Sequence, residues 1–298
     1  MSVQAKAKNH ELFRRQKDLL ATFLSTGAIT RAQHDRSLHC LMEKMGIDDA
    51  EQGEQAISAP DEPTKKNGSP VKPCAAPPGF VYVSHVIPDA ILDIRYYSSD
   101  NFTGRRVDGY EAPVALLTAE AAEALKAAGD EVRKKGFRFK IFDAYRPLRA
   151  VNHFLRWAQD PAETGTKERF YPNINKSEII PRGYIAKRSG HCRGSSIDLT
   201  LWETATGKEV DMGGTFDWFG KESHPDWCGD PDKNEYTGPF PGNMRAAGGK
   251  INEEEFRNRM FLRQIMMRHG FLPIAEEWWH FTLKNEPWPE TYFDFPVR

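Results

Sequence analysis

The sequence has no long hydrophobic run and no excess of charge of one sign. No apolar stretch approaches the roughly 18 residues that a membrane-spanning helix requires. The 41 basic and 42 acidic residues nearly cancel, and the formal net charge of -1 creates no long-range field that would attract nucleic acid. We therefore expect neither a membrane nor a nucleic acid among the partners.

The N-terminus and the cysteines lack two further signals. Residues 1–9 are polar and contain no apolar core of a signal peptide, which predicts a cytoplasmic protein. None of the four cysteines (Cys40, Cys74, Cys192, Cys228) stands in a C-x-x-C pair, which argues against a structural zinc knuckle. Scattered thiols in a cytosolic protein are usually free, although a Cys192–Cys228 bridge is an alternative.

The overall composition is ordinary for a globular protein, and the residue pattern divides the chain into three segments. The 298 residues, 39% hydrophobic and 28% charged, suffice for one large or two modest domains. Residues 1–47 carry two apolar stripes at helical spacing, separated by Gly27, and predict a helical hairpin. Residues 48–77 are rich in proline and polar residues, which predicts a linker. Residues 78–298 form the main domain.

Within the main domain, strand and helix patterns do not alternate strictly. Alternating or apolar runs predict strands at residues 80–86, 91–97, 137–142 and 197–202, and an interrupted strand at 271–283. Caps, glycines and helical spacing predict helices at residues 118–135, 148–159 and 252–268. This order favours the α+β class, with a mainly antiparallel central sheet flanked by helices.

The first candidate site surrounds a histidine in a glycine-rich loop. His191 lies between Gly190 and Gly194, which allow a tight return, and Asp198 lies on the predicted strand that follows. Asp198 points away from the apolar face of that strand, and an aspartate there needs a partner such as a cation. Zinc hydrolases use three protein ligands and one open position for water. His191 and Asp198 are thus candidate ligands; the alternative is a loop histidine beside a surface aspartate.

The second candidate site is the E-x-x-H segment that begins at Glu277 and ends at His280. Positions i and i+3 lie on opposite faces of an extended strand, so these two side chains share a site only if the chain turns between them. His280 would be the third ligand and Glu277 the carboxylate that takes a proton from water. Glu276 is an alternative base. The alternative for the whole segment is a pair of core tryptophans with polar neighbours.

A third segment, D-A-Y-R-P, runs from Asp143 to Pro147 at the end of a predicted strand. Arg146 is a candidate donor to the oxyanion of a tetrahedral intermediate, an interaction generally worth several kcal/mol. The alternative is a structural Asp143–Arg146 ion pair.

Together these segments resemble the zinc D,D-peptidases, and within them the D-alanyl-D-alanine dipeptidases of the vancomycin-resistance type. The S-x-H-x-x-G-x-x-x-D pattern of that family reads here from Ser189 to Asp198, and E-x-x-H follows at Glu277–His280. The D-A-Y-R-P stretch is typical of the dipeptidase branch, as are segments matching residues 95–104 and 211–217. The resemblance covers about residues 78–298, whereas residues 1–76 have no counterpart in that branch.

The resemblance implies one Zn²⁺ per chain and a role for each site residue. Its ligands would be His191, Asp198 and His280, with Glu277 and Arg146 as the catalytic base and the oxyanion donor. Substrate contacts would come from Ser189 at the carboxylate end of the substrate, Asp217 at its ammonium, and Tyr96 and Asp143 in the pocket.

The leading hypothesis is therefore a zinc metallopeptidase that hydrolyses a small D,D-dipeptide, D-alanyl-D-alanine, to free D-alanine. One alternative is a cell-wall D,D-carboxypeptidase or endopeptidase on the same scaffold. A second, from another class, is a zinc-containing binding module without catalysis, docked to a partner through its N-terminal hairpin.

Overall fold

The computed structural model separates into two compact units, Met1–Pro78 and Gly79–Arg298. It describes residues 13, 16–18, 20–22, 24–25, 31–45 and 76–78 of the first unit, and residues 79–225, 227, 229–230, 235–236 and 251–298 of the second.

The first unit contains helix α2 (Arg31–Met45) and helical residues between positions 13 and 25. Phe13 and Met42 are buried together, and Leu38 and Leu41 pack against them. The stripe predicted on the second helix is thus the side that packs. The hairpin and the linker at 48–77 stay predictions, since residues 26–30 and 46–75 lie outside the described residues.

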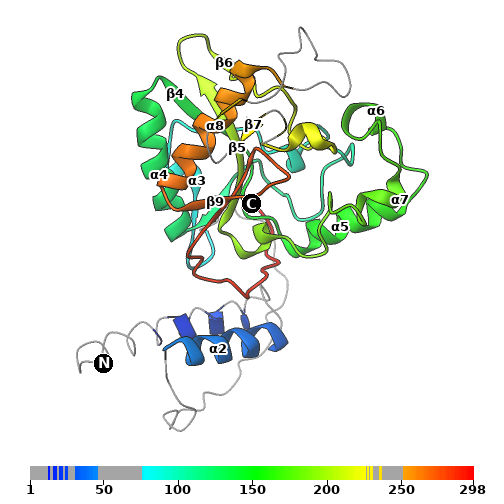
Figure 1. Cartoon of the computed structure of the whole chain (residues 1–298). Helices are drawn as coiled ribbons and strands as arrows, with labels where there is room; N and C mark the ends of the chain where they lie inside the picture. Colours follow the sequence, from blue (N-terminus) through cyan, green and yellow to red (C-terminus); the bar gives the residue numbers. More distant parts are fainter. Residues whose placement is uncertain are drawn as a thin grey trace, which may run out of the picture. The chain divides into compact units, whose positions relative to one another are not determined.

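The second unit is built on a mixed six-stranded sheet (Figure 1). Its strand order is β2-β4-β5-β10-β9, with β6 beside β5. The strands are β2 (Ile91–Leu92), β4 (Phe137–Asp143), β5 (Ser196–Glu203), β6 (Lys208–Glu209), β9 (Phe271–Pro273) and β10 (His280–Leu283).

The sheet differs from the predicted, mainly antiparallel one at one edge. β2 runs parallel to β4, whereas β4, β5, β6, β9 and β10 pair antiparallel. Parallel neighbours need a long crossover connection, and the chain between β2 and β4 supplies it with helix α4 (Ala119–Lys134). Helices with a mixed sheet confirm the α+β class, and the sequence pattern held no sign of the parallel pair.

Two predicted strands are shorter than expected. The segment 80–86 forms β1 (Phe80–Tyr82), which pairs with β3 (Leu116–Thr118), and then turns into helix α3 (Val83–Val86). The segment 91–97 continues after β2 as a 3₁₀ turn, η2 (Arg95–Tyr97). Short apolar runs fit a strand and a buried helical turn equally well, so the pattern could not separate them.

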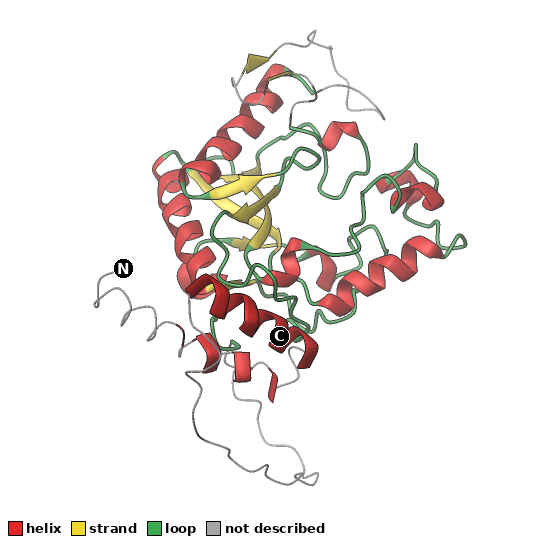
Figure 2. Cartoon of the chain, turned by 60° about the horizontal axis from the view of Figure 1, so that its bottom comes forward, coloured by secondary structure: helices red, strands yellow, loops and turns green. Residues whose placement is uncertain are grey.

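The long helices begin and end near the predicted positions. Thr118 caps α4 by accepting a hydrogen bond from the Ala121 amide, and a capping box of Asn252 and Glu255 begins α8 (Glu253–Arg268). α4 and α8 lie side by side against the sheet, while α5 (Leu148–Gln159), α6 (Lys167–Phe170) and α7 (Lys176–Ile179) lie on its other side (Figures 1 and 2). Among the described helices, none is long and apolar enough to cross a membrane.

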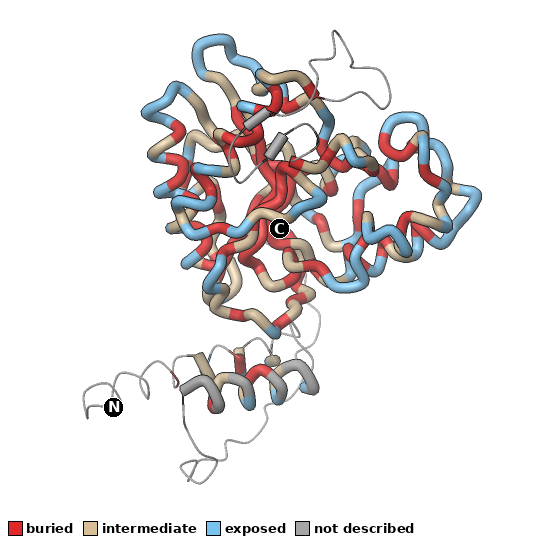
Figure 3. Tube along the Cα trace, in the orientation of Figure 1, coloured by how far each residue is buried: buried red, intermediate tan, exposed pale blue. Residues whose placement is uncertain are grey.

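The central strand β5 is buried on both faces, which its alternation of apolar and polar residues did not by itself reveal (Figure 3). Leu199 and Leu201 pair with Ile141 and Phe139 of β4 and form the apolar face beneath α4. Residues of the opposite face include Asp198 and Thr200, which are equally buried. That second face is therefore a buried polar surface, and it carries the candidate site.

Gly194 connects the histidine loop to β5 in a conformation that only glycine adopts easily. Its φ is 80°, and a Cβ placed there would lie 2.3 Å from the Phe80 ring of β1. The tight return predicted from the sequence thus depends on both the missing side chain and the close packing of β1.

We expect Gly194→Ala to destabilise the protein more than Gly207→Ala, a matched control with a φ of 62° and no described atom within 4 Å of the added Cβ. The control should lose roughly 1–2 kcal/mol through backbone strain, and Gly194→Ala about 1–3 kcal/mol more through overpacking. Urea unfolding of both variants measures the difference. Equal losses would show that Phe80 does not constrain this turn.

Candidate metal and catalytic site

His191 lies on a short 3₁₀ turn, η3 (Gly190–Arg193), at the start of β5. The Ser189 side chain accepts a hydrogen bond from the His191 amide and caps the turn. The imidazole Nδ1 lies 2.6 Å from the carbonyl oxygen of Ala144. A carbonyl can only accept, so Nδ1 carries the proton and Nε2 keeps a lone pair for a metal.

Asp198 and His280 lie directly opposite each other on the adjacent antiparallel strands β5 and β10. Directly opposed residues share a face of the sheet, and that face is the buried polar one. The turn required between Glu277 and His280 is present, because residues 278–279 form a turn immediately before β10. The structure therefore brings the E-x-x-H histidine beside the aspartate of the first segment.

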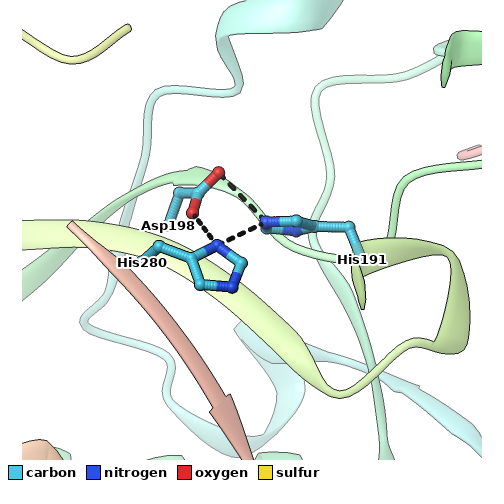
Figure 4. A group of neighbouring side chains, drawn as sticks. All are labelled: His191, Asp198 and His280. Atoms are coloured by element: carbon cyan, nitrogen blue, oxygen red, sulfur yellow. Dashed lines mark hydrogen bonds and ion pairs between the residues drawn. The ribbon is translucent and has the colours of Figure 1, made fainter. Parts of the chain in front are cut away.

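The donor atoms of His191, Asp198 and His280 converge on one point (Figure 4). His191 Nε2 lies 3.0 Å from His280 Nδ1 and 3.2 Å from an Asp198 carboxylate oxygen, and His280 Nδ1 lies 3.0 Å from the other oxygen. Ligands at about 2.1 Å from a tetrahedral zinc ion would stand about 3.4 Å apart. All three side chains are buried, so the donor set fits a metal ion in both chemistry and spacing.

The charges of these side chains also favour a cation. Burial alone would raise the pKa of Asp198, but the attraction of His191 and hydrogen bonds with both histidines outweigh it and hold that pKa well below its ordinary value. Asp198 is thus a buried carboxylate anion, and such an anion is stable only when it is paired or coordinated.

Glu277 lies beside the ligands, with a carboxylate oxygen 3.9 Å from His280 Nδ1 and about a third of its side chain exposed (32%). Burial raises its pKa to about 7, and the electrostatic influence of His280 only partly opposes this rise. Glu276, the alternative base, also lines the pocket but is exposed.

Asp143 and Arg146 reach the site through an irregularity in β4. The register shifts between Ile141 and Asp143. Asp143 therefore pairs with Asp198, whereas an unshifted antiparallel register would pair it with Ile197. A bulge of this kind re-aims the residues that follow it. Asp143 accepts hydrogen bonds from Tyr110 (2.6 Å) and Arg146 Nε (2.8 Å).

Arg146 is fixed between carboxylates and aromatic rings. Its Nη2 lies 3.4 Å from Asp198, and its guanidinium lies over the rings of Tyr96 and Phe154 at 4.9 and 5.2 Å from their centroids. The Asp143–Arg146 ion pair offered as the structural alternative is present, and it is also what holds Arg146 beside the candidate ligands.

Asp217 and Tyr96 form a second polar pair in the same pocket. The Tyr96 hydroxyl lies 3.1 and 3.0 Å from the two carboxylate oxygens of Asp217. Burial raises the pKa of Asp217 well above its ordinary value, although Arg146 opposes the rise. Asp217 is also the one described non-glycine residue with positive φ, at 61°. Such strain is found mainly at functional sites.

A single pocket of about 210 Å³ joins these groups. Its lining includes Tyr96, Arg146, Ser189, Asp217 and Glu277 together with the three candidate ligands. Drug-sized sites occupy about 300–1,000 Å³, so this pocket suits a smaller molecule. Asp143 contributes through Arg146 rather than as part of the lining.

Cys192, next to a candidate ligand, is a buried free thiol, so the bridge to Cys228 is not formed. Burial raises its pKa to about 12. The sulfur therefore stays protonated and does not compete as a thiolate ligand.

Sequence reasoning missed the groups that support the site from behind. Tyr110 and the Ala144 carbonyl hold Asp143 and His191. Thr282 contacts His280, and Ser196 in turn contacts Thr282. Thr282 had a signal, since it lies two positions after His280 on the same strand face. Tyr110 had none, because its partner is 33 residues away.

Comparisons with known proteins agree with this geometry. A family model described as D-ala-D-ala dipeptidase, peptidase M15, matches residues 77–235 and 243–298. The chain is 41% identical over 220 residues to a D-alanyl-D-alanine dipeptidase of Enterococcus faecium. The aligned region covers 74% of this chain and 98% of that protein. It is 41% identical over 218 residues to one of Streptomyces coelicolor, covering 73% and 98%.

A more distant relative, the D-alanyl-D-alanine dipeptidase of Escherichia coli, is 28% identical over 204 residues, covering 68% of this chain and 84% of that protein. The family resemblance drawn from the three sequence segments is confirmed. The chain belongs to the peptidase M15 family of D-ala-D-ala dipeptidases.

Proposed function

We propose that this protein is a zinc-dependent dipeptidase that hydrolyses D-alanyl-D-alanine to two molecules of D-alanine. The observation that carries the proposal is one small pocket in which a buried His-Asp-His set, a carboxyl group and an arginine converge. The substrate is inferred from the relatives, whose names state this activity. The pocket size supports it, since a dipeptide is smaller than a drug-sized ligand.

His191, Asp198 and His280 would hold the zinc ion, one per chain. A zinc ion in such a site acts as a Lewis acid, which polarises a carbonyl and lowers the pKa of water. The lone pair of His191 Nε2 would be available to the metal, because Nδ1 donates its hydrogen to the Ala144 carbonyl. The carboxylate of Asp198 would be available as well, because its lowered pKa keeps it ionised.

Glu277 is the proposed general base and acid. Its carboxylate would take a proton from the attacking water and deliver it to the leaving amine. A pKa raised toward neutrality suits both transfers, since a group half-protonated at the working pH can accept and donate.

Arg146 is the proposed donor to the tetrahedral oxyanion. Its Nε is held by Asp143, which leaves Nη hydrogens directed at the pocket beside Asp198. The Tyr96 and Phe154 rings on which it lies exclude water, and in such surroundings a fixed cation stabilises developing negative charge strongly.

Asp217 is the proposed partner of the substrate ammonium. Among the described residues the buried Asp217 carboxyl has the Tyr96 hydroxyl as its direct partner and no ion pair, although Arg146 lowers its pKa from a distance, and a substrate ammonium would supply an opposite charge in contact with it. Ser189 would contact the carboxylate end, and Tyr96 would hold Asp217 in place.

The rival functions have less support. A carboxypeptidase or endopeptidase must admit a longer or blocked chain, for which a 210 Å³ pocket with a buried carboxyl leaves little room. The cytoplasmic location, the domain division and a docking role for the N-terminal residues stay predictions.

We expect metal-loaded protein to hydrolyse D-alanyl-D-alanine and to hydrolyse N-acetyl-D-alanyl-D-alanine at least ~10²-fold less efficiently, because a blocked amine offers no ammonium to pair with Asp217. Release of D-alanine from both substrates gives the kcat/KM ratio. Efficient cleavage of the blocked substrate would favour a carboxypeptidase, and turnover of neither would favour a binding module.

We expect Glu277→Gln to retain zinc and lose about 10²–10⁴-fold in kcat, since the substitution removes only the proton-transfer group. Glu276→Gln serves as the control and should keep nearly full activity. Zinc content and kcat are measured on both variants. The opposite result, with Glu276→Gln inactive, would assign the base to Glu276.

We expect His280→Ala to weaken zinc affinity by more than the ~10–100-fold that loss of an outer-shell partner causes. The exposed His85 of α3 provides a control, His85→Ala, that should bind zinc as wild type does. Competition with a chelator of known affinity measures both. Unchanged affinity of His280→Ala would remove this histidine from the metal site.

A further inference from the structure

The second ring nitrogen of His280 lies against a hydroxyl pair that none of the proposed catalytic roles uses. His280 Nε2 is 3.1 Å from Thr282 Oγ1, and Thr282 Oγ1 is 2.7 Å from Ser196 Oγ. In Figure 4 this nitrogen lies on the side of the ring away from Asp198 and His191. Ser196 is completely buried and Thr282 partly so.

The register of the sheet creates this arrangement. His280 pairs with Asp198, and Thr282 pairs with Ser196 two residues further along the same two strands. Because side chains at i and i+2 share a face, both pairs lie on the polar face of the sheet. Thr282 is therefore placed behind His280 by the same pairing that places Asp198 in front of it.

The protonation of His280 follows from its two contacts. Nδ1 faces Asp198 and His191 and must keep a lone pair to bind a metal. A neutral imidazole then carries its proton on Nε2, and Thr282 Oγ1 is the acceptor. The Thr282 hydroxyl can in turn donate a hydrogen bond to Ser196 Oγ. The His280 Nε2–H, the Thr282 hydroxyl and the Ser196 hydroxyl then all have hydrogen-bond partners.

Ser196 also connects this pair to the loop of His191. A Cβ at residue 190 would lie 2.8 Å from Ser196 Oγ, so the serine hydroxyl fits only because residue 190 is glycine. The hydroxyl pair thus lies between the two segments that carry the histidines.

From this geometry we propose that Thr282, backed by Ser196, is a positioning residue that fixes the Nδ1-binding tautomer and ring orientation of His280 and thereby sets the affinity for zinc. The inference rests on the proposed zinc site but not on the identity of the substrate. Thr282 contacts neither metal nor substrate; it acts through the imidazole.

Thr282→Val tests this idea, because it replaces the hydroxyl with a methyl group of similar size. We expect zinc affinity to fall about 10–100-fold, as for other outer-shell partners of metal ligands. Thr282→Ser restores the hydroxyl and should restore the affinity to near the wild-type value. Competition with a chelator measures the affinity of each purified full-length variant.

Thr200→Val is the matched control. Thr200 is a buried threonine on the same face of β5, and its hydroxyl has no hydrogen-bond partner among the described residues. This variant should bind zinc as wild type does. Thermal unfolding of the metal-free variants separates positioning from general stability, since Thr282→Val should lose zinc affinity without a matching loss of metal-free stability.

Zinc affinity of Thr282→Val equal to that of Thr200→Val would overturn the inference. So would a Thr282→Ser variant as weak as Thr282→Val, because packing rather than the hydroxyl would then be responsible. A wild-type protein that binds no zinc would instead overturn the proposed metal site, and this inference with it.

Discussion

The pairing register of β5 with β10 is the constraint on which the rest of the site depends. It places Asp198 opposite His280 and Ser196 opposite Thr282 on one face of the sheet. A slip of one residue would move a whole strand's side chains to the other face, where α4 covers an apolar core. The apolar partners on that other face, among them Ile197 and Phe281, are what makes such a slip costly. The hydrophobic core thus fixes the register on which the candidate metal site depends.

The electrostatics of the site work against stability and in favour of binding. Asp143, Asp198 and Asp217 are all buried, with Glu277 close by, and Arg146 is the cation placed among them. Such a cluster is expensive to bury unless each charge has a partner. A bound divalent cation would supply a partner for Asp198, and a substrate ammonium would supply one for Asp217. The positive φ of Asp217 fits the same account, since residues in such sparsely populated conformations cluster at active sites and ligand clamps.

Local chemistry could be predicted from the sequence, whereas pairing between distant segments could not. The capping box at Asn252 and the turn before His280 depend on neighbours within a few residues, and the structure contains both. The bulge that carries Asp143 onto the site face and the Tyr110 hydroxyl that holds it arise from contacts across the chain. In β5, periodicity separated an apolar face from a polar face, but it left open whether the polar face is buried, as it is in the structure.

The same buried charges explain how a small pocket could select its substrate more sharply than size alone allows. Steric exclusion separates a dipeptide from longer chains, but it discriminates poorly against a molecule that differs only in one capped amine. The buried Asp217 carboxyl changes this, because a ligand without an ammonium leaves it with the Tyr96 hydroxyl but no ionic partner in a largely desolvated position. The free-energy cost of leaving the Asp217 carboxyl without an ionic partner lowers the affinity for a blocked ligand. It adds no affinity for the free dipeptide. In the proposed function, Asp217 would therefore act chiefly by rejection, and its strained, desolvated position is what makes the rejection strong.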